Sequence, residues 1–161
     1  MKKVLVAYFS ATGNTAKLAK CLSETIHADL FEIRPGKVYT EADLNWHDKS
    51  SRSSVEMNDR TARPEIAEKV GNMGEYDTVF VGFPIWWYTA PRIINTFLES
   101  YDFSDKTVVP FATSGGSEID GIADKLKTSC SEKTKFKSGK RFSEYDTAIL
   151  KSWVDSLGIE I

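Results

Sequence analysis

The chain has 161 residues, of which 41% are hydrophobic and 27% charged, and its formal net charge is −2. This length predicts a single domain over residues 1–161 whose core needs no disulfide or metal, and the composition is that of an ordinary globular protein. The charge lacks the basic excess that nucleic-acid binding requires, and no apolar run approaches the roughly 18 residues of a membrane span, so neither nucleic acid nor membrane is an expected partner.

The first half of the chain alternates between strand and helix patterns. Residues 4–9 form a continuous apolar run, which is typical of a parallel strand covered on both faces. Leu18, Leu22 and Ile26 then recur at every fourth position, with Thr15 and Ala19 on the same side, as in an amphipathic helix. Residues 30–33 indicate a short second strand. Residues 35–63 are polar and irregular, and a connection this long is usually functional or mobile. A further helix is expected over residues 64–70.

The second half repeats the alternation. Residues 78–83 and 107–112 are strong apolar strands, although Pro110 in the latter suits a strand end or an edge. A helix is expected to begin at Pro91, because proline is well placed in a first turn. Three more elements follow, namely a helix at 119–126, a polar edge strand within 134–142, and a closing helix whose apolar side carries Tyr145, Ile149, Trp153 and Leu157. This alternation predicts an α/β sandwich with helices on both faces of a parallel sheet.

The two cysteines, Cys21 and Cys130, both lie at helical spacing from apolar residues. They are expected to be small apolar groups at the buried edges of helices. A pair this sparse provides neither a disulfide framework nor metal-ligand spacing, and it favours a reducing, cytoplasmic setting.

The loops that follow the strong strands carry the candidate site, because ligands of open parallel sheets bind outside the carboxyl ends of the strands. The loop after the first strand comprises Ser10, Ala11, Thr12, Gly13, Asn14 and Thr15. Its polar side chains, with the free N–H groups of a helix N-terminus, favour phosphate binding over simple helix capping. The loop lacks the lysine of a nucleoside-triphosphate loop, the glycine pattern of a dinucleotide site and the cysteine of a thiolate phosphatase, and no acid ends the preceding strand as in a phospho-acceptor domain. What remains is a metal-free site for a terminal phosphate monoester.

Two further loops are expected to complete the site. After residues 78–83 come Pro84, Ile85, Trp86, Trp87 and Tyr88. Their adjacent aromatic rings are suited to cover a flat ring system; one ring is expected to pack on the following helix and at least one to line the ligand. After residues 107–112 come Thr113, Ser114, Gly115 and Gly116. The paired glycines let backbone N–H groups approach a ligand closely.

Together these loops resemble those of the flavodoxin family, and the resemblance extends over nearly the whole chain. Residues 10–15 resemble the family's FMN phosphate loop, residues 84–88 the loop that stacks on the isoalloxazine ring, and residues 113–117 the loop that flanks its pyrimidine end. The resemblance implies a flavodoxin-like three-layer sandwich of the short-chain group, with a five-stranded parallel sheet in the order 2-1-3-4-5 and non-covalently bound FMN. It also implies a small electron-transfer protein without catalytic residues, whose partners are a reductase and an electron acceptor. A monomer is expected, with a dimer as the alternative.

The chain departs from well-studied carriers of this family in three respects. Residues 84–90 contain no glycine, so weaker stabilisation of the one-electron-reduced flavin is expected. The flavin-flanking loops contain no acid before Glu118, so charge repulsion should lower the reduction potential less than in strongly acidic carriers. The connection at 35–63 is unlike a simple crossover, and Arg60 and Arg63 within it are interpreted as solvated surface residues rather than contacts to an anionic substrate.

A second functional hypothesis stays open beside the carrier. In it the protein is an FMN-dependent reductase that passes electrons from NAD(P)H to a quinone, azo or nitro compound, as relatives of this fold do. An open flavin face and a pocket built by residues 35–63 would distinguish it. A third hypothesis, a non-redox FMN-binding module, is disfavoured by the aromatic loop. His27 and His47 are expected at the surface, away from the site.

Overall fold

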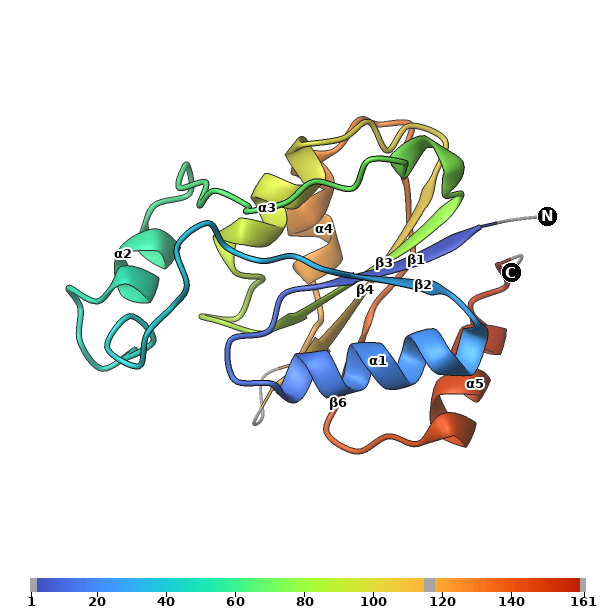
Figure 1. The fold of residues 1–161 in the computed structure, drawn as a ribbon, viewed down its shortest axis with the longest axis horizontal. Coiled ribbons are helices and arrows are strands. Elements are labelled where there is room, and N and C mark those ends of the chain that lie inside the picture. Colours follow the sequence, from blue (N-terminus) through green and yellow to red (C-terminus); the bar gives the residue numbers. More distant parts are fainter. Residues whose placement is uncertain (1–2, 115–117, 160–161) are drawn as a thin grey trace.

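The computed structural model describes residues 3–114 and 118–159, and it places a parallel sheet between two layers of helices (Figure 1). The strands are β1 (Val4–Tyr8), β2 (Asp29–Glu32), β3 (Thr78–Pro84), β4 (Thr107–Thr113), β5 (Lys135–Phe136) and β6 (Lys140–Phe142). The path through the sheet is β2-β1-β3-β4-β5, with β6 also paired to β4, and every one of these pairs is parallel. The expected α/β fold and strand order are therefore confirmed.

The fifth position of the sheet is shared by β5 and β6, where one edge strand was expected within residues 134–142. Val108 of β4 accepts a hydrogen bond from the Lys137 N–H (3.0 Å), so by alternation Pro110 faces the same edge. Because Pro110 has no N–H to donate, a continuous ladder cannot form opposite it. The edge strand breaks there, and the sheet has six strands instead of the expected five.

The helices divide between the two faces of the sheet (Figure 1). On one face lie α1 (Asn14–Ile26) and α5 (Thr147–Ser156), and on the other α3 (Arg92–Glu99) and α4 (Ile122–Leu126). Two 3-10 turns, Met73–Glu75 and Lys127–Ser129, complete the regular structure. Within the described ranges, no helix has both the length and the apolar character that crossing a membrane requires.

Alternating strand residues feed two apolar clusters, one on each face. Leu5 and Val79 join the cluster beneath α3 and α4, whereas Val4 and Phe80 join the cluster beneath α1 and α5. The apolar side expected for the closing helix is wrong at one position, because Ile149 is 41% exposed. The helix is turned so that Leu150, Trp153 and Val154 are its buried residues.

Gly82 of β3 is required by the packing of its neighbour in the sheet. It lies opposite Phe111 of β4, whose side chain is fully buried. A Cβ atom at Gly82 would come within 2.3 Å of the Phe111 ring, which no side chain can do without displacing it. Glycine therefore allows this ring to occupy the core over β3.

The connection after β2 differs from its prediction. The helix expected over residues 64–70 is wrong, because Ile66 instead forms an antiparallel bridge with Pro35. The Gly36 N–H donates to the Glu65 carbonyl (2.8 Å), and the Ala67 N–H donates to the Arg34 carbonyl (2.7 Å). Pairing with the extension of β2 thus competes successfully with local helix formation.

The helix of this region lies earlier, inside the stretch expected to be irregular. It is α2 (Arg52–Asn58), and its cap is Ser51, whose hydroxyl accepts from the Ser54 N–H. Figure 1 shows α2 standing beyond the end of the sheet at which β1, β3 and β4 finish. The long connection, residues 37–63, therefore extends beside the expected ligand site and is called the side segment below.

Candidate functional site

The three loops expected to form the site meet at the carboxyl ends of β1, β3 and β4. The Thr15 and Thr113 hydroxyls lie 2.8 Å apart in a hydrogen bond, which joins the first loop to the third. The Ile85 N–H donates to the Thr113 carbonyl (3.0 Å), which joins the second loop to the third. In the sheet, the connection that follows β1 leads to β2 on one side, whereas the connection that follows β3 leads to β4 on the other. The topological switch point therefore lies between β1 and β3, where ligands of such sheets bind.

The first loop presents unoccupied hydrogen-bond donors to solvent. Gly13 has a φ of 96°, a left-handed conformation that glycine adopts without strain, and open space surrounds it. Its N–H donates to the Ser10 hydroxyl (3.1 Å). In the described ranges the exposed side chains of Thr12 and Asn14 have no hydrogen-bond partner, and helix geometry leaves the first-turn amides of α1 without acceptors. No acidic residue in that turn competes for them, so this end of α1 can hold an anion.

The second loop displays two aromatic rings on a tight turn. Trp86 and Thr89 exchange two backbone hydrogen bonds of 2.9 Å, and between them Trp87 and Tyr88 have φ values of 47° and 62°. Left-handed backbone is uncommon for bulky residues and costs roughly 1–2 kcal/mol each. Trp87 is 39% exposed and Tyr88 75%. The fold therefore holds two large rings outward in a conformation that they do not favour.

Trp86, by contrast, packs inward. Its ring makes edge-to-face contacts with Phe9, at the end of β1, and with Tyr39 of the side segment, at centroid distances of 5.6 and 5.5 Å. Phe9 and Tyr39 also contact each other at 5.6 Å. The aromatic run thus divides into one packed ring and two displayed rings, although these contacts of Trp86 are to Phe9 and Tyr39 rather than to the following helix.

Tyr39 is itself held by an ion pair of α2. The Arg52 guanidinium lies 3.8 Å from the centre of the Tyr39 ring, and its Nε donates to a Glu56 carboxylate oxygen at 2.9 Å. The Tyr39 hydroxyl donates to the other oxygen of Glu56. Burial, reinforced by that hydrogen bond, raises the pKa of Tyr39 far above its usual range, so the phenol stays neutral. Sequence reasoning missed this cluster, although Arg52 and Glu56 have the i, i+4 spacing of a helical ion pair.

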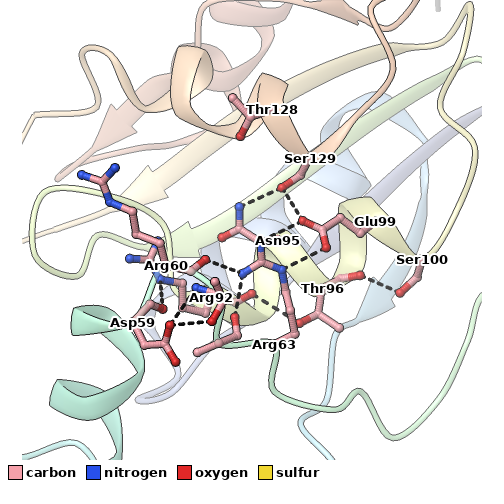
Figure 2. A network of polar contacts seen from close by, with 12 residues as sticks. Asp59, Arg60, Arg63, Arg92, Asn95, Thr96, Glu99, Ser100, Thr128 and Ser129 are labelled. Carbon is pink, nitrogen blue, oxygen red and sulfur yellow. Dashed lines mark hydrogen bonds and ion pairs between the residues drawn. The ribbon is translucent and has the colours of Figure 1, made fainter.

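Two arginines fasten the side segment to α3 (Figure 2). Arg92, in the first turn of α3, donates to the carbonyls of Met57 (3.0 Å), Asp59 (3.2 Å) and Glu56 (3.3 Å) at the end of α2. A cation there satisfies carbonyls that a helix terminus leaves unpaired. Burial and the nearby arginines lower the pKa of Arg92 from its ordinary value.

Arg63 and Arg60 have different surroundings. Arg63 forms a two-pronged ion pair with Glu99 of α3, with N–O distances of 2.9 and 3.0 Å. It is therefore an anchor of the segment, whereas solvation alone was expected. The Arg60 side chain has no hydrogen-bond or ion-pair partner among the residues the structure describes, and Figure 2 shows it directed away from this network.

The third loop is described only in part. Thr113 and Ser114 are half-buried at the end of β4, and the expected residues Gly115 and Gly116 lie outside the described residues. Lys125 of α4 lies at the edge of the candidate site, with its ammonium group 3.5 Å from the carbonyl oxygen of Tyr88 in the second loop.

Two hollows flank the aromatic contact between Tyr39 and Trp86. One, of about 390 Å³, is lined by Phe9, Ser10, Ala11, Glu32, Arg34, Pro35, Val38, Tyr39, Ala67 and Glu68. The other, of about 380 Å³, is lined by Leu44, Trp46, Ser53, Ile85, Trp86, Trp87 and Tyr88 and is called the aromatic hollow below. The side segment therefore provides one wall of each. His47 is exposed as expected, but it stacks on Trp46 (3.7 Å) and so lies beside the aromatic hollow.

A larger hollow, of about 770 Å³, lies at the opposite end of the sheet, between the start of β1 and the end of α1. Its two lysines are already paired, Lys3 with Glu75 and Lys151 with Asp155. The carboxyl end of α1 carries partial negative charge, and Asp29 adds a further acid. Because both of its lysines are already paired with acids, this hollow suits a phosphate less well than the first loop does, despite its size.

The described residues contain no group of three or more metal-ligating side chains. Cys21 and Cys130 are both free and half-buried. Burial raises the pKa of the Cys130 thiol to about 11, so the group is protonated rather than a thiolate at neutral pH.

Comparison with known proteins agrees with this geometry. A family model described as flavodoxin matches residues 3–157. A protein from Bacteroides eggerthii, provisionally assigned as a flavoprotein, is 49% identical with a TM-score of 0.95, over 99% of this chain and all of that one. A second, from Bacteroides uniformis and also provisionally assigned, is 51% identical with a TM-score of 0.91, over 96% and 98% of the two chains.

A flavoprotein from Lactobacillus acidophilus, solved in complex with FMN, has the same fold. Its TM-score is 0.73 and its identity 22%, over 99% of this chain and all of that one. None of the curated proteins matches the sequence significantly.

Proposed function

Because the chain belongs to the flavodoxin family, we propose that it binds FMN non-covalently where β1, β3 and β4 end. The observation that carries this proposal is the unpaired donor set of the first loop beside two outward-facing aromatic rings. The complex of the Lactobacillus acidophilus flavoprotein with FMN supports the choice of flavin, since that protein has the same fold.

The first loop fits the phosphate of FMN. The first-turn amides of α1 and the side chains of Thr12 and Asn14 are donors without acceptors in the described part of the chain. Open space at Gly13 lets a phosphate approach the backbone. The helix end supplies partial positive charge without a lysine, so a monoester phosphate can be held with no metal ion. Ser10, Ala11 and Thr15 complete this proposed cradle.

The second and third loops fit the flavin ring. Trp87 or Tyr88 covers one face of the ring, with Pro84, Ile85 and Trp86 supporting the turn that holds them. Thr113, Ser114, Gly115 and Gly116 bond the pyrimidine edge. When bound, FMN supplies the one- and two-electron redox chemistry. The chain's own residues bind and orient it, and none is needed as a general acid or base.

The primary proposal is a small electron-transfer protein that exchanges electrons with protein partners, one a reductase and one an acceptor. Exposed rings beside a cofactor are suited to transient docking. Lys125 places a cation close to the aromatic turn, and the first acidic residue after β4 is Glu118. The reduction potential is therefore expected above those of strongly acidic carriers.

A second candidate function is an FMN-dependent reductase of a quinone, azo or nitro compound. One observation favours it, namely that the side segment builds the aromatic hollow against the turn proposed to hold the flavin. Rapid steady-state oxidation of NAD(P)H by the FMN-loaded protein would select this candidate. Absence of turnover, with electrons passing instead to a small redox protein, would select the carrier.

Titration of the flavin-free protein with FMN and with riboflavin, followed by flavin fluorescence, tests the proposal. FMN should bind one-to-one with quenching and at least 100-fold more tightly than riboflavin, because only FMN carries the phosphate. Thr12→Ala should weaken FMN binding about fivefold and leave riboflavin unchanged. The control is Ser152→Ala, at an exposed position of α5. Equal affinities for FMN and riboflavin would contradict a phosphate site in the first loop.

A further inference from the structure

One edge of the sheet carries a concentration of positive charge. Residues 133–141, which include β5 and β6, contain five cations and no acid. The whole chain has a net charge of −2, so without these five cations the remainder has a net charge of −7. Four of the five, Lys133, Lys135, Lys137 and Lys140, are called the basic edge below. The small net charge of the chain therefore conceals a strongly basic strip on an otherwise acidic molecule.

The basic edge is not neutralised by acids. The fifth cation of the stretch, Arg141, is paired with Glu118 at 3.1 Å, whereas the four lysines form no ion pair within the described ranges. Three of these lysines are exposed, and Lys137 is half-buried. Like charges along one strip repel one another, so the stability of the folded chain does not favour this arrangement. The strip presents unneutralised charge to solvent.

Lysines on an edge strand can also serve to prevent pairing with another sheet. That role needs charge of either sign, and the opposite edge of this sheet, β2, exposes the acids Asp29 and Glu32. β5 and β6 have only two and three residues, so they offer little backbone for another strand to pair with. Protection of the edge therefore does not explain why residues 133–141 carry five charges of one sign.

The basic edge leads to the candidate site. Lys140 of β6 pairs with Phe111 of β4 in the sheet, and its ammonium group lies 5.7 Å from the centre of the Phe142 ring. Phe142 in turn pairs with Thr113, the first residue of the third loop, and belongs to the cluster beneath α1 and α5. On the other face of the sheet, Lys125 of α4 lies close to the second loop. A partner seated on the basic edge would therefore lie beside the third loop, with cations on both faces of the sheet.

The surroundings of the basic edge suit an acidic protein better than a small anion or a long polyanion. Two of its lysines line a hollow of about 430 Å³, but Asp77 and Asp105 line it too and disfavour a small anion. A nucleic acid or an anionic membrane would extend beyond the strip and meet the net negative charge of the remainder. The rings of the strip, Phe136 and Phe142, are half-buried and buried, so neither is displayed for a base to stack on.

We propose that the basic edge is the docking surface for an acidic redox protein with which the chain exchanges electrons. Opposite charges attract and orient such a partner, and exposed charge contacts are weak enough to let it leave again. The partner then sits beside the third loop of the site. This inference rests on the proposed flavin site for the exchange of electrons but not for the docking itself.

The kinetic test presents the FMN-loaded chain with two redox proteins of opposite charge, an acidic plant-type ferredoxin and the basic cytochrome c. Each reduced ferredoxin gives one electron to the oxidised flavin, whereas each ferric cytochrome c takes one electron from the reduced flavin. Replacing Lys133, Lys135 and Lys140 together by Gln should slow the reaction with ferredoxin at least about tenfold at low ionic strength. The same change should not slow the reaction with cytochrome c. Added salt should slow the ferredoxin reaction of the wild type and remove its advantage over the variant.

The matched control replaces Lys20, Lys49 and Lys69 together by Gln. These lysines are exposed, lie in other parts of the chain and form no ion pair among the described residues. Because both triple variants have the same net charge, the control isolates the position of the charge, and its ferredoxin rate should change less than about twofold. Replacing the three edge lysines by Arg should preserve the wild-type rate, since only the charge is required. All these variants should retain the wild-type affinity for FMN.

Calorimetric titration of the flavin-free chain with oxidised ferredoxin separates docking from electron exchange. The wild type and the Arg variant should bind ferredoxin at low ionic strength, and the edge Gln variant should lose this binding. If FMN does not bind to the chain, the proposed function fails, and this titration still decides on the basic edge.

Several results would overturn the inference. Equal slowing by the edge and control variants would reduce the effect to net charge. A ferredoxin rate that does not fall with salt, or no binding of ferredoxin to the wild type, would remove the docking surface. Tighter binding of a short DNA duplex than of ferredoxin at the same ionic strength would assign the basic edge to nucleic acid. Self-association that the edge Gln variant abolishes would assign it to a second copy of the chain.

Discussion

The sheet and the side segment are held by different forces. In the sheet, parallel backbone ladders and fully buried apolar residues such as Val81 and Phe111 fix the structure. In the side segment, Tyr39 and Met57 are the buried apolar residues, and individual polar contacts do much of the rest, with Arg92 holding the end of α2 and Arg63 pairing with Glu99. The comparison teaches that the scaffold for a ligand is cooperative, whereas one wall of the site depends on a few buried side chains and a few cations.

This difference has a consequence for motion. Local opening is easiest where few apolar contacts are buried and where single hydrogen bonds carry the structure. Release of the arginine contacts should therefore loosen the side segment while the sheet and the phosphate loop stay folded.

Gly82→Ala should have the largest effect, because it acts on the cooperative region. The new Cβ would approach the Phe111 ring to 2.3 Å, and overpacking of this kind costs up to about 3 kcal/mol of unfolding free energy. Urea denaturation measures the loss. Phe111→Leu in the same chain should recover part of it, and a loss below about 0.5 kcal/mol in Gly82→Ala alone would show that the sheet is more adaptable than supposed.

Arg92→Met should act on the side segment alone. It leaves the carbonyls at the end of α2 without their charged donor, which should lower the free energy of opening this segment by about 2 kcal/mol. Hydrogen–deuterium exchange should accelerate in α2 and stay unchanged in β1 and β3. The matched control is Arg60→Met, whose guanidinium has no partner in the described residues, and it should leave exchange unaltered. Uniform acceleration in both regions would mean that they unfold as one unit.

Ser53→Ala should raise stability by about 1 kcal/mol, because it removes a buried hydroxyl that lacks a partner. Ser54→Ala is the matched comparison and should lower stability by a similar amount, since that hydroxyl is bonded to Ser51. Thermal melting of the two variants gives the signs directly. A loss of stability in Ser53→Ala would indicate that its hydroxyl has a partner in solution.

Arg63→Gln should have the smallest effect, and the effect should depend on pH. The Arg63 hydrogen bond lowers the pKa of the Glu99 carboxyl from its ordinary 4.5. A lowered pKa in the folded state stabilises the protein above that ordinary value, and the contribution is lost as the pH falls below it. Because both groups are partly exposed, the variant should lose only about 0.5 kcal/mol at pH 7. The difference should shrink as the pH falls through the lowered pKa of Glu99 and vanish once that carboxyl is protonated in the folded protein. A difference that does not change with pH would exclude the ion pair as its cause.

The sequence was sufficient for the scaffold and for the position of the loops. Continuous apolar runs locate β1, β3 and β4, and the hydroxyl-rich loop before α1 follows from a strand ending where a helix begins. These features are local, so a single sequence carries them. Pro110 is an intermediate case. The sequence shows that it has no N–H, but the break in the neighbouring edge strand depends on how that strand pairs with β4 across the sheet.

The side segment and the stretch that follows it, residues 64–70, could not be predicted in the same way. Ile66 and Val70 have helical spacing, yet two apolar residues are weak support, and backbone pairing with Pro35 prevails. The true helix offered a serine cap and the Arg52–Glu56 spacing, but no apolar stripe. The contact of Tyr39 with Trp86 joins residues far apart in the chain and has no local signal at all.

The most direct test of the central claim is to record backbone amide chemical shifts of the flavin-free protein as FMN is added. The account predicts the largest changes at residues 10–15, 85–88 and 113–114, with smaller changes in the side segment. The amides of His27 and Asp29, at the larger hollow on the other end of the sheet, should not move. Largest changes at those residues, or none in the three loops, would contradict a flavin site at the carboxyl ends of the strands.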